Sequence, residues 1–209
     1  AVEGEAEAVL LKPANLQDAG EASAAPPSVE LEPVPLTPDI AVAAAHGELQ
    51  QVVEWLQQGG HVDALAEHGC GLLHAAATGG RLRVAKELLQ RGASVDLRGV
   101  VGTTALIMAA GRGLHAMVRL LLEHKAISDL QNAVGSTALM LAAGGGHKEC
   151  VQELLGAGAS TELRGRDGIT ALQVAEASGH AAIAKLLRQQ KANPSAASSK
   201  AVVTAEARA

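Results

Sequence analysis

The chain has 209 residues, with one Trp, no Phe or Tyr, two Cys and a formal net charge of −5. Residues 1–38 hold seven acidic side chains against one Lys, whereas residues 39–191 hold 14 acidic and 14 basic side chains. Without a basic excess we expect no nucleic-acid partner. No apolar run approaches the ~18 residues that cross a bilayer, so we expect no membrane partner either. Two Cys are too few for a disulfide framework, which favours a reducing compartment.

Residues 1–36 are acidic and contain five prolines among Ala, Glu and Ser, without an apolar period. This composition predicts a disordered, acidic, Pro/Ala-rich leader. The first residues are acidic with only a short apolar patch, so they do not resemble a signal peptide. We therefore expect a cytoplasmic or nuclear protein.

A period of 33 residues begins near Thr37 and continues to Lys191. Two sets of residues recur at this spacing: Gly69, Gly102, Gly135 and Gly168, and Leu73, Leu106, Leu139 and Leu172. A fixed period of this length predicts a stack of similar supersecondary units instead of one globular core. We place the units at about residues 37–66, 67–98, 99–131, 132–164 and 165–191, and interpret residues 192–209 as a flexible tail or a truncated sixth unit.

Each unit contains two short amphipathic stretches. Thr37 is expected to cap the first helix, with Pro38 at its first position. In the third unit, the spacing of apolar residues predicts helices over Thr104–Arg112 and Leu114–Glu123, separated by Gly113. A hairpin loop with a polar or Gly-containing turn then leads into the next unit. The predicted fold class is all-α.

The repeated segment resembles the ankyrin repeat. Its motif appears as Gly-Thr-Thr-Ala-Leu-Ile-Met-Ala-Ala from Gly102 and as Gly-Ser-Thr-Ala-Leu-Met-Leu-Ala-Ala from Gly135, and the second helices end in Leu-Leu. The resemblance implies a solenoid of about five helix-turn-helix units with short β-hairpin loops. The chain departs from the family pattern at the helix starts, where Ala or Leu replaces Pro, and the family's His survives only as His74.

Candidate metal and nucleotide sites are few. A cluster formed by His61, His68, Cys70 and His74 contains zinc-binding residue types, but in this register they would lie in different loops and a helix start, so we expect no metal. Residues 111–116 fit the dinucleotide fingerprint G-x-G-x-x-A, which requires a preceding strand. We interpret this segment as a turn between helices, and expect no cofactor, no catalytic residues and no enzyme activity within the chain.

Three other residues are assigned by their place in the repeat. Cys150 is equivalent to Val84 and Met117, and Trp55 to the Leu residues near the ends of the second helices, so both are predicted core residues. Cys70 is predicted to lie at a hairpin tip and to be the more exposed of the two thiols.

By its resemblance, the chain is expected to bind through hairpin tips and the inner, concave face of the first helices. The predicted partner-binding residues are Glu67, His68, Cys70, Val100, Val101, Thr103, Arg112, Val134, Ser136, Arg166, Asp167 and Ile169. Four of them, Val100, Val101, Val134 and Ile169, are apolar at positions where the family commonly has polar residues. An exposed apolar row is disfavoured in water unless a partner covers it, so we expect the centre of the contact here.

These observations predict a monomeric scaffold or adaptor that binds a partner protein. The alternative is a regulatory or targeting ankyrin segment of a larger enzyme, such as a kinase or a ubiquitin-ligase adaptor.

Overall fold

The computed structural model describes residues 34–67 and 69–192. Within them the elements, in chain order, are α1 (Pro38–His46), α2 (Leu49–Gln57), α3 (Leu72–Gly79), α4 (Leu82–Gln90), the 3-10 turn η1 (Val100–Gly102), α5 (Ala105–Gly111), α6 (His115–Glu123), α7 (Ala138–Gly144), α8 (Lys148–Gly156), α9 (Ala171–Ala177) and α10 (Ala181–Ala192). None of these helices is long and apolar enough to span a bilayer.

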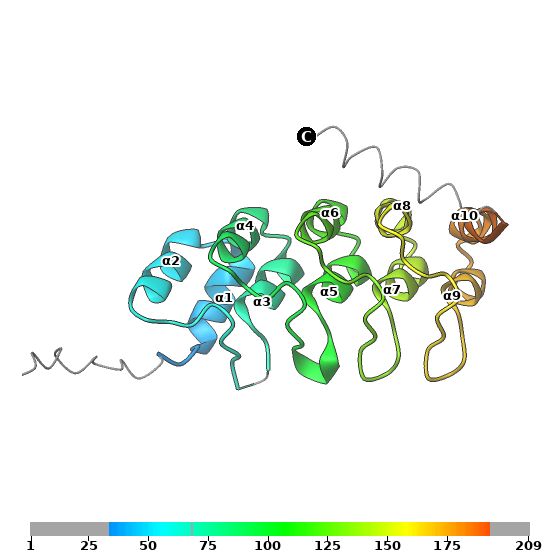
Figure 1. Cartoon of the computed structure of the whole chain (residues 1–209). Helices are drawn as coiled ribbons and strands as arrows, with labels where there is room; N and C mark the ends of the chain where they lie inside the picture. Colours follow the sequence, from blue (N-terminus) through cyan, green and yellow to red (C-terminus); the bar gives the residue numbers. More distant parts are fainter. Residues whose placement is uncertain (1–33, 68, 193–209) are drawn as a thin grey trace, which may run out of the picture. The chain divides into compact units, whose positions relative to one another are not determined.

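The helices form two rows (Figure 1). The odd-numbered helices, the first of each pair, pack against one another in chain order, and so do the even-numbered second helices. Four loops extend beyond the row of first helices. The expected all-α solenoid of five helix pairs is confirmed. Among the described residues the hairpin loops contain isolated bridges, such as Leu65 with Gly71, and no named strand.

Threonine side chains start several of the first helices. Thr104 Oγ1 accepts a hydrogen bond from the Ile107 amide (3.4 Å), and Thr137 Oγ1 accepts one from the Met140 amide (3.2 Å). This contact satisfies one of the free amides at a helix start. The predicted cap at Thr37 is wrong, because its side chain makes no capping bond, although Pro38 does open α1 as expected.

The core consists of Leu, Val, Ile and Ala side chains between the two rows of helices. One alanine in each of the first four first helices, Ala44, Ala76, Ala109 and Ala142, is 0% exposed, which allows these helices to pack closely. The predicted burial of Trp55 and Cys150 is confirmed, at 5% and 1% exposure. The core is therefore continuous from one repeat to the next, and each repeat depends on its neighbours.

A periodic hydrogen bond joins successive repeats. An aspartate in the loop after α2, after α4 and after α6 accepts a hydrogen bond from the backbone amide of a residue 31 positions later. The pairs are Asp63 with Ser94 (2.8 Å), Asp96 with Ile127 (3.0 Å) and Asp129 with Ser160 (2.9 Å). These charge-assisted contacts help fix the translation from one repeat to the next.

The structure also describes the end of the segment predicted to be a leader. Val34 forms a parallel bridge with Gly60, and Leu36 is buried in the core of the first repeat. The residues directly before α1 therefore pack against the first helix pair. The rest of the predicted leader and the predicted tail beyond Ala192 lie outside the described residues.

Candidate functional site

The hairpin tips repeat one backbone geometry. A hydrogen bond across each hairpin joins Ala66 N to Cys70 O (3.0 Å), Gly99 N to Thr103 O (2.9 Å), Asn132 N to Ser136 O (3.1 Å) and Gly165 N to Ile169 O (3.0 Å). Between these partners the chain turns through Gly69, Gly102, Gly135 and Gly168, which all have positive φ. Left-handed backbone is accessible to Gly at low cost, which explains why glycine recurs at this position every 33 residues.

Neighbouring tips are hydrogen-bonded to each other. The Ala133 amide donates to Val101 O (2.8 Å), and the Arg166 amide donates to Val134 O (3.3 Å). Nearer the hairpin base, Gln131 Nε2 donates to Arg164 O (2.8 Å), as Arg98 Nη1 does to Gln131 O (3.0 Å). Three successive tips therefore form one connected ridge, which we call the tip ridge and define as residues 99–103, 132–136 and 165–169.

The tip ridge exposes apolar side chains. Val100, Val101, Val134 and Ile169 are 43%, 55%, 55% and 38% exposed. Val101 and Val134 occupy equivalent positions 33 residues apart, whereas Ile169 lies two residues further along its hairpin, on the returning arm. The predicted exposure of all four is confirmed, but Ile169 is not in strict register with the two valines.

Val101 has an unfavourable backbone conformation. Its φ is 55° and its ψ is 28°, in the left-handed region. A β-branched residue rarely adopts this conformation, and a non-Gly residue there costs about 1–2 kcal/mol. An exposed, apolar and strained side chain at a tip contributes little to folding, and such outliers are frequent at functional positions.

The remaining predicted residues fall into two groups. Glu67, Arg112, Arg166 and Asp167 are exposed, whereas Cys70, Thr103 and Ser136 are only half-exposed at the returning arms of their hairpins. His68 lies outside the described residues. Asp167 Oδ1 accepts the Ile169 amide (3.0 Å), so this carboxylate also stabilises its own turn.

The exposed face of the first helices contains a row that the sequence analysis did not identify. Val42 is exposed, its first equivalent Ala75 is buried, and the next equivalents at 33-residue spacing, Met108, Leu141 and Val174, are half-exposed. Thr78 Oγ1 contacts Met108 Sδ (3.2 Å). The row was missed because its period is hidden within the apolar pattern of the core positions on the same helices.

Small residues at the ends of the first helices make room for this row. A Cβ at Gly111 would lie 3.5 Å from the Leu141 side chain, and one at Gly144 would lie 2.9 Å from Val174 Cγ1. Gly111 and Gly144 are the last residues of α5 and α7. The Val174 side chain of the next repeat therefore explains the absence of a side chain at Gly144, whereas a methyl group at Gly111 would make an ordinary contact with Leu141.

The described members of the candidate metal cluster, His61, Cys70 and His74, are not placed to hold a metal ion. His74 is fully buried: its Nδ1 accepts the Gly71 amide (3.2 Å), and its Nε2 lies against Leu97 O (2.9 Å) and Thr103 O (3.1 Å). His61 Nδ1 accepts the Asp63 amide (3.2 Å). Across residues 34–67 and 69–192, no three His, Cys, Asp or Glu side chains are placed to hold a metal ion.

Neither thiol has the environment of a nucleophile. Burial raises the pKa of Cys70, and burial together with the nearby Glu149 and Glu153 raises the pKa of Cys150 to about 11. Reactive thiols need a lowered pKa, because the thiolate is the nucleophile. Cys70 is the more exposed of the two, as predicted.

The glycine motif at residues 111–116 connects two helices. It begins at the last residue of α5 and continues into the first turn of α6. A dinucleotide site needs a strand before the motif. The interpretation of this segment as an inter-helix turn is confirmed.

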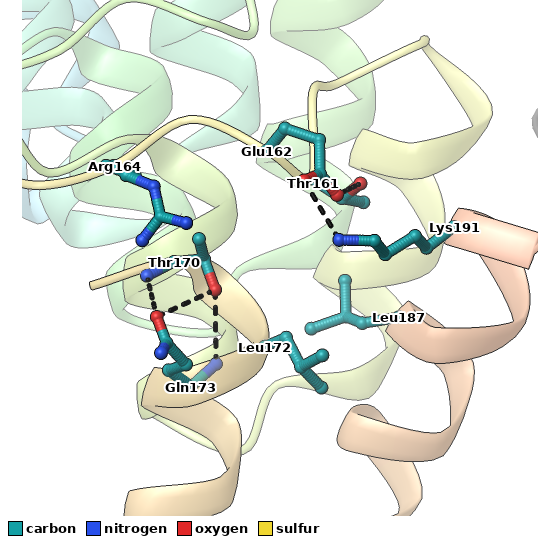
Figure 2. A pocket seen from close by; sticks show the side chains of 8 residues that line it. All are labelled: Thr161, Glu162, Arg164, Thr170, Leu172, Gln173, Leu187 and Lys191. Carbon is teal, nitrogen blue, oxygen red and sulfur yellow. Dashed lines mark hydrogen bonds and ion pairs between the residues drawn. The ribbon is translucent and has the colours of Figure 1, made fainter. Parts of the chain in front are cut away.

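A cavity of about 190 Å³ opens beside the last helix pair. It is lined by Thr161, Glu162, Arg164, Thr170, Leu172, Gln173, Leu187 and Lys191 (Figure 2). Glu162 accepts a hydrogen bond from Lys191 Nζ (3.0 Å), and this contact lowers the pKa of the carboxyl group. In the repeat, Glu162 is equivalent to Asp129, which instead accepts an amide of the following repeat.

The cavity therefore lies on the surface of the last helix pair that corresponds, in the interior repeats, to the surface packed against the following repeat. Leu172 in its wall is half-exposed, whereas its equivalents Leu106 and Leu139 are covered by the next helix pair. Its lining is explained by the repeat register.

The chain was compared with known proteins. A family model described as "Ankyrin repeats (3 copies)" matches residues 40–132 and 127–198. A search of curated proteins finds no match.

Proposed function

The chain belongs to the ankyrin repeat family, and from this membership we propose that it is a non-enzymatic scaffold or adaptor that binds a partner protein through the tip ridge and the adjoining face of the first helices. Ankyrin repeats are in general protein–protein interaction modules. The partner-binding role of individual residues is the specific part of the proposal.

The observation that carries the proposal is the exposed apolar surface of the tip ridge. Val100, Val101 and Val134 lie on tips that are hydrogen-bonded to one another, and none of them contributes to the buried core. Apolar area of this kind is stabilised when a partner removes it from water, by about 25 cal/mol per Å². Arg166 is exposed within the ridge and Arg112 is exposed at the end of α5, and both are candidates for polar contacts with the partner.

We propose a non-enzymatic role because each group that could have indicated a catalytic or cofactor site has a structural explanation. The buried His74 stabilises the hairpin base, the glycine motif is an inter-helix turn, and both thiols have raised pKa values. Each group therefore has a structural role or environment that accounts for it.

The proposal is tested by affinity capture followed by mass spectrometry, with the Val101→Glu/Val134→Glu double variant beside the wild type. We expect a protein that the wild type retains and the double variant loses. Ile127→Glu is the matched control, because Ile127 is 53% exposed but lies in the loop after α6, outside the tip ridge. A partner retained equally by the wild type and the double variant would place the site elsewhere.

A further inference from the structure

We infer that the tip ridge binds an amphipathic α-helix of the partner, and that this helix presents an apolar stripe with acidic side chains at its margin. The inference rests on the proposed function and specifies the chemistry of the partner at the same surface.

Charge is unevenly distributed in the two central repeats. Apart from His, Arg112 is the one charged side chain in their tips and first helices, which are residues 99–114 and 132–147. Residues 115–131 and 148–164, which include the second helices, contain nine charged side chains. The central surface is therefore apolar with a single cation and without a carboxylate.

Counted together with Arg112, three exposed cations lie on or beside this central surface, against two exposed carboxylates. Arg98 precedes the first tip of the ridge, and Arg166 lies in the last one, both exposed. The nearby carboxylates, Glu67 and Asp167, belong to the outer tips, and Asp167 already accepts the Ile169 amide. A partner that is apolar at the centre of the contact and acidic at its margin complements this distribution.

Two other ways of binding a peptide lack the surface that they need. Proline-rich segments dock on exposed aromatic side chains, but the chain has no Phe or Tyr and its one Trp, Trp55, is buried. Strand addition needs the edge of a sheet, and the described residues form no named strand. A helix needs only apolar side chains at a suitable spacing.

The repeat supplies that spacing. Packed helices lie about 8–10 Å apart, and we expect the tips of successive repeats to follow each other at about that distance. A helix rises about 10.5 Å in seven residues and returns to nearly the same face. Apolar residues seven apart on a partner helix can therefore contact successive tips, whereas same-face residues of a strand lie about 6.6 or 13 Å apart.

The ridge is also formed before binding. Its tips are held by the bonds from Ala133 to Val101 and from Arg166 to Val134, and by the side chains of Arg98 and Gln131. A preformed surface avoids the cost of ordering loops on association.

The test uses the full chain and two fluorescent helical peptides of about three heptads. Both carry Leu at every seventh position and the same neutral residues elsewhere; one has Glu beside the stripe and the other has Lys. Fluorescence anisotropy should show that the Glu peptide binds at least about tenfold more tightly than the Lys peptide. Arg112→Glu should reduce the difference in affinity between the two peptides, or make the Lys peptide the tighter binder.

Matched variants locate the site. Val101→Asp should weaken binding of the Glu peptide by about tenfold or more, and it should fold, because Asp tolerates the left-handed conformation of this position. Ile127→Asp should leave binding unchanged, and circular dichroism checks that both variants are folded.

Equal affinity for the two peptides, equal losses in the two variants, no binding of either peptide, or tighter binding of a proline-rich peptide would each overturn the helix inference. Capture of a partner by the wild type and not by the double variant would then still support the proposed function, so the two failures are distinguishable.

Discussion

Lys125 occupies a position at which other repeats have glycine. Its φ is 67°, and its equivalents Gly59, Gly92 and Gly158 have φ of 100°, 85° and 88°. The chain after each second helix needs a left-handed residue, and Lys supplies it with steric strain that glycine avoids.

Lys125→Gly should therefore relieve backbone strain, although the greater entropy of glycine in the unfolded chain offsets part of this gain. The net stabilisation should be up to about 1 kcal/mol. Urea unfolding followed by circular dichroism measures the change. Gly92→Lys is the reciprocal control and should destabilise the protein by a similar amount. A stability loss in Lys125→Gly would show that the side chain makes contacts that outweigh the backbone strain.

His74 is neutral in the folded protein because its ring is buried. Burial lowers its pKa below the ordinary value of 6.5, although the carbonyls of Thr103 and Leu97 and the charge of Asp63 act in the opposite direction. The unfolded chain binds a proton to this residue at a higher pH than the folded protein does. The corresponding stability is present above pH 6.5 and is lost as the pH falls from 6.5 toward the folded pKa.

His74→Gln should remove this component of the pH dependence. Gln173, at the equivalent position of the last repeat, accepts the Thr170 amide through Oε1 (3.0 Å), so Gln can replace the bond from Gly71 to His74 Nδ1. The free energy of unfolding between pH 7 and pH 5 should fall less steeply in the variant. The same slope in both proteins would show that His74 does not cause the acid sensitivity.

The proposed site depends on the hairpins. Two equivalent glycines in neighbouring hairpins allow the cost of backbone strain to be distinguished from the cost of a clash between repeats. Gly135 and Gly168 have φ of 78° and 75°. A Cβ at Gly135 would lie 2.6 Å from the Arg166 amide nitrogen, whereas a Cβ at Gly168 would have no neighbour within 4 Å.

Gly168→Ala should cost about 1–2 kcal/mol from strain alone. Gly135→Ala should cost more, because the added methyl group also forces the neighbouring tip away. Thermal and urea unfolding of the two variants compare them directly. Equal costs would mean that the tips move apart without resistance, which contradicts a rigid tip ridge.

The elements that the sequence predicted best are those determined by side chains with a strict period. The predicted helices Thr104–Arg112 and Leu114–Glu123 agree with α5 and α6 to within one residue at each end, because Leu and Ala positions and the glycine turns specify them. The bonds between tips were not predictable, since they join backbone groups of any residue type, as at Ala133 and Val101.

Candidate site residues were predicted less completely. Exposure of Val101 and Val134 follows from their place at a turn, and the structure confirms it. The left-handed backbone of Val101 and the exposed position of Val42 depend on packing and chain path, for which a single sequence contains no signal. The failed cap at Thr37 has the same origin: the residue type is suitable, but its side chain does not reach the amide.

For the molecule as a whole, the position of a repeat in the stack decides how much a residue contributes. Leu139 and Leu172 are equivalent, but Leu139 is 1% exposed between repeats, and Leu172 lines the open cavity of the last one (Figure 2).

Leu139→Ala should therefore cost about 2–5 kcal/mol, as for a fully buried leucine, and Leu172→Ala clearly less. Circular dichroism follows the unfolding of both variants, and the buried Trp55 reports on the first repeat without interference from Tyr. If Leu172→Ala costs as much as Leu139→Ala, the end of the stack is covered by further chain.

The central claim is that the tip ridge is the surface that meets a partner, and site-specific photocrosslinking in living cells tests it most directly. A photoreactive amino acid is placed at Val134 in one variant and at Ile127 in another, two positions of nearly equal exposure, 55% and 53%. We expect a discrete crosslinked protein from position 134 and none from position 127. Crosslinking from position 127 alone, or of the same protein from both positions, would contradict it.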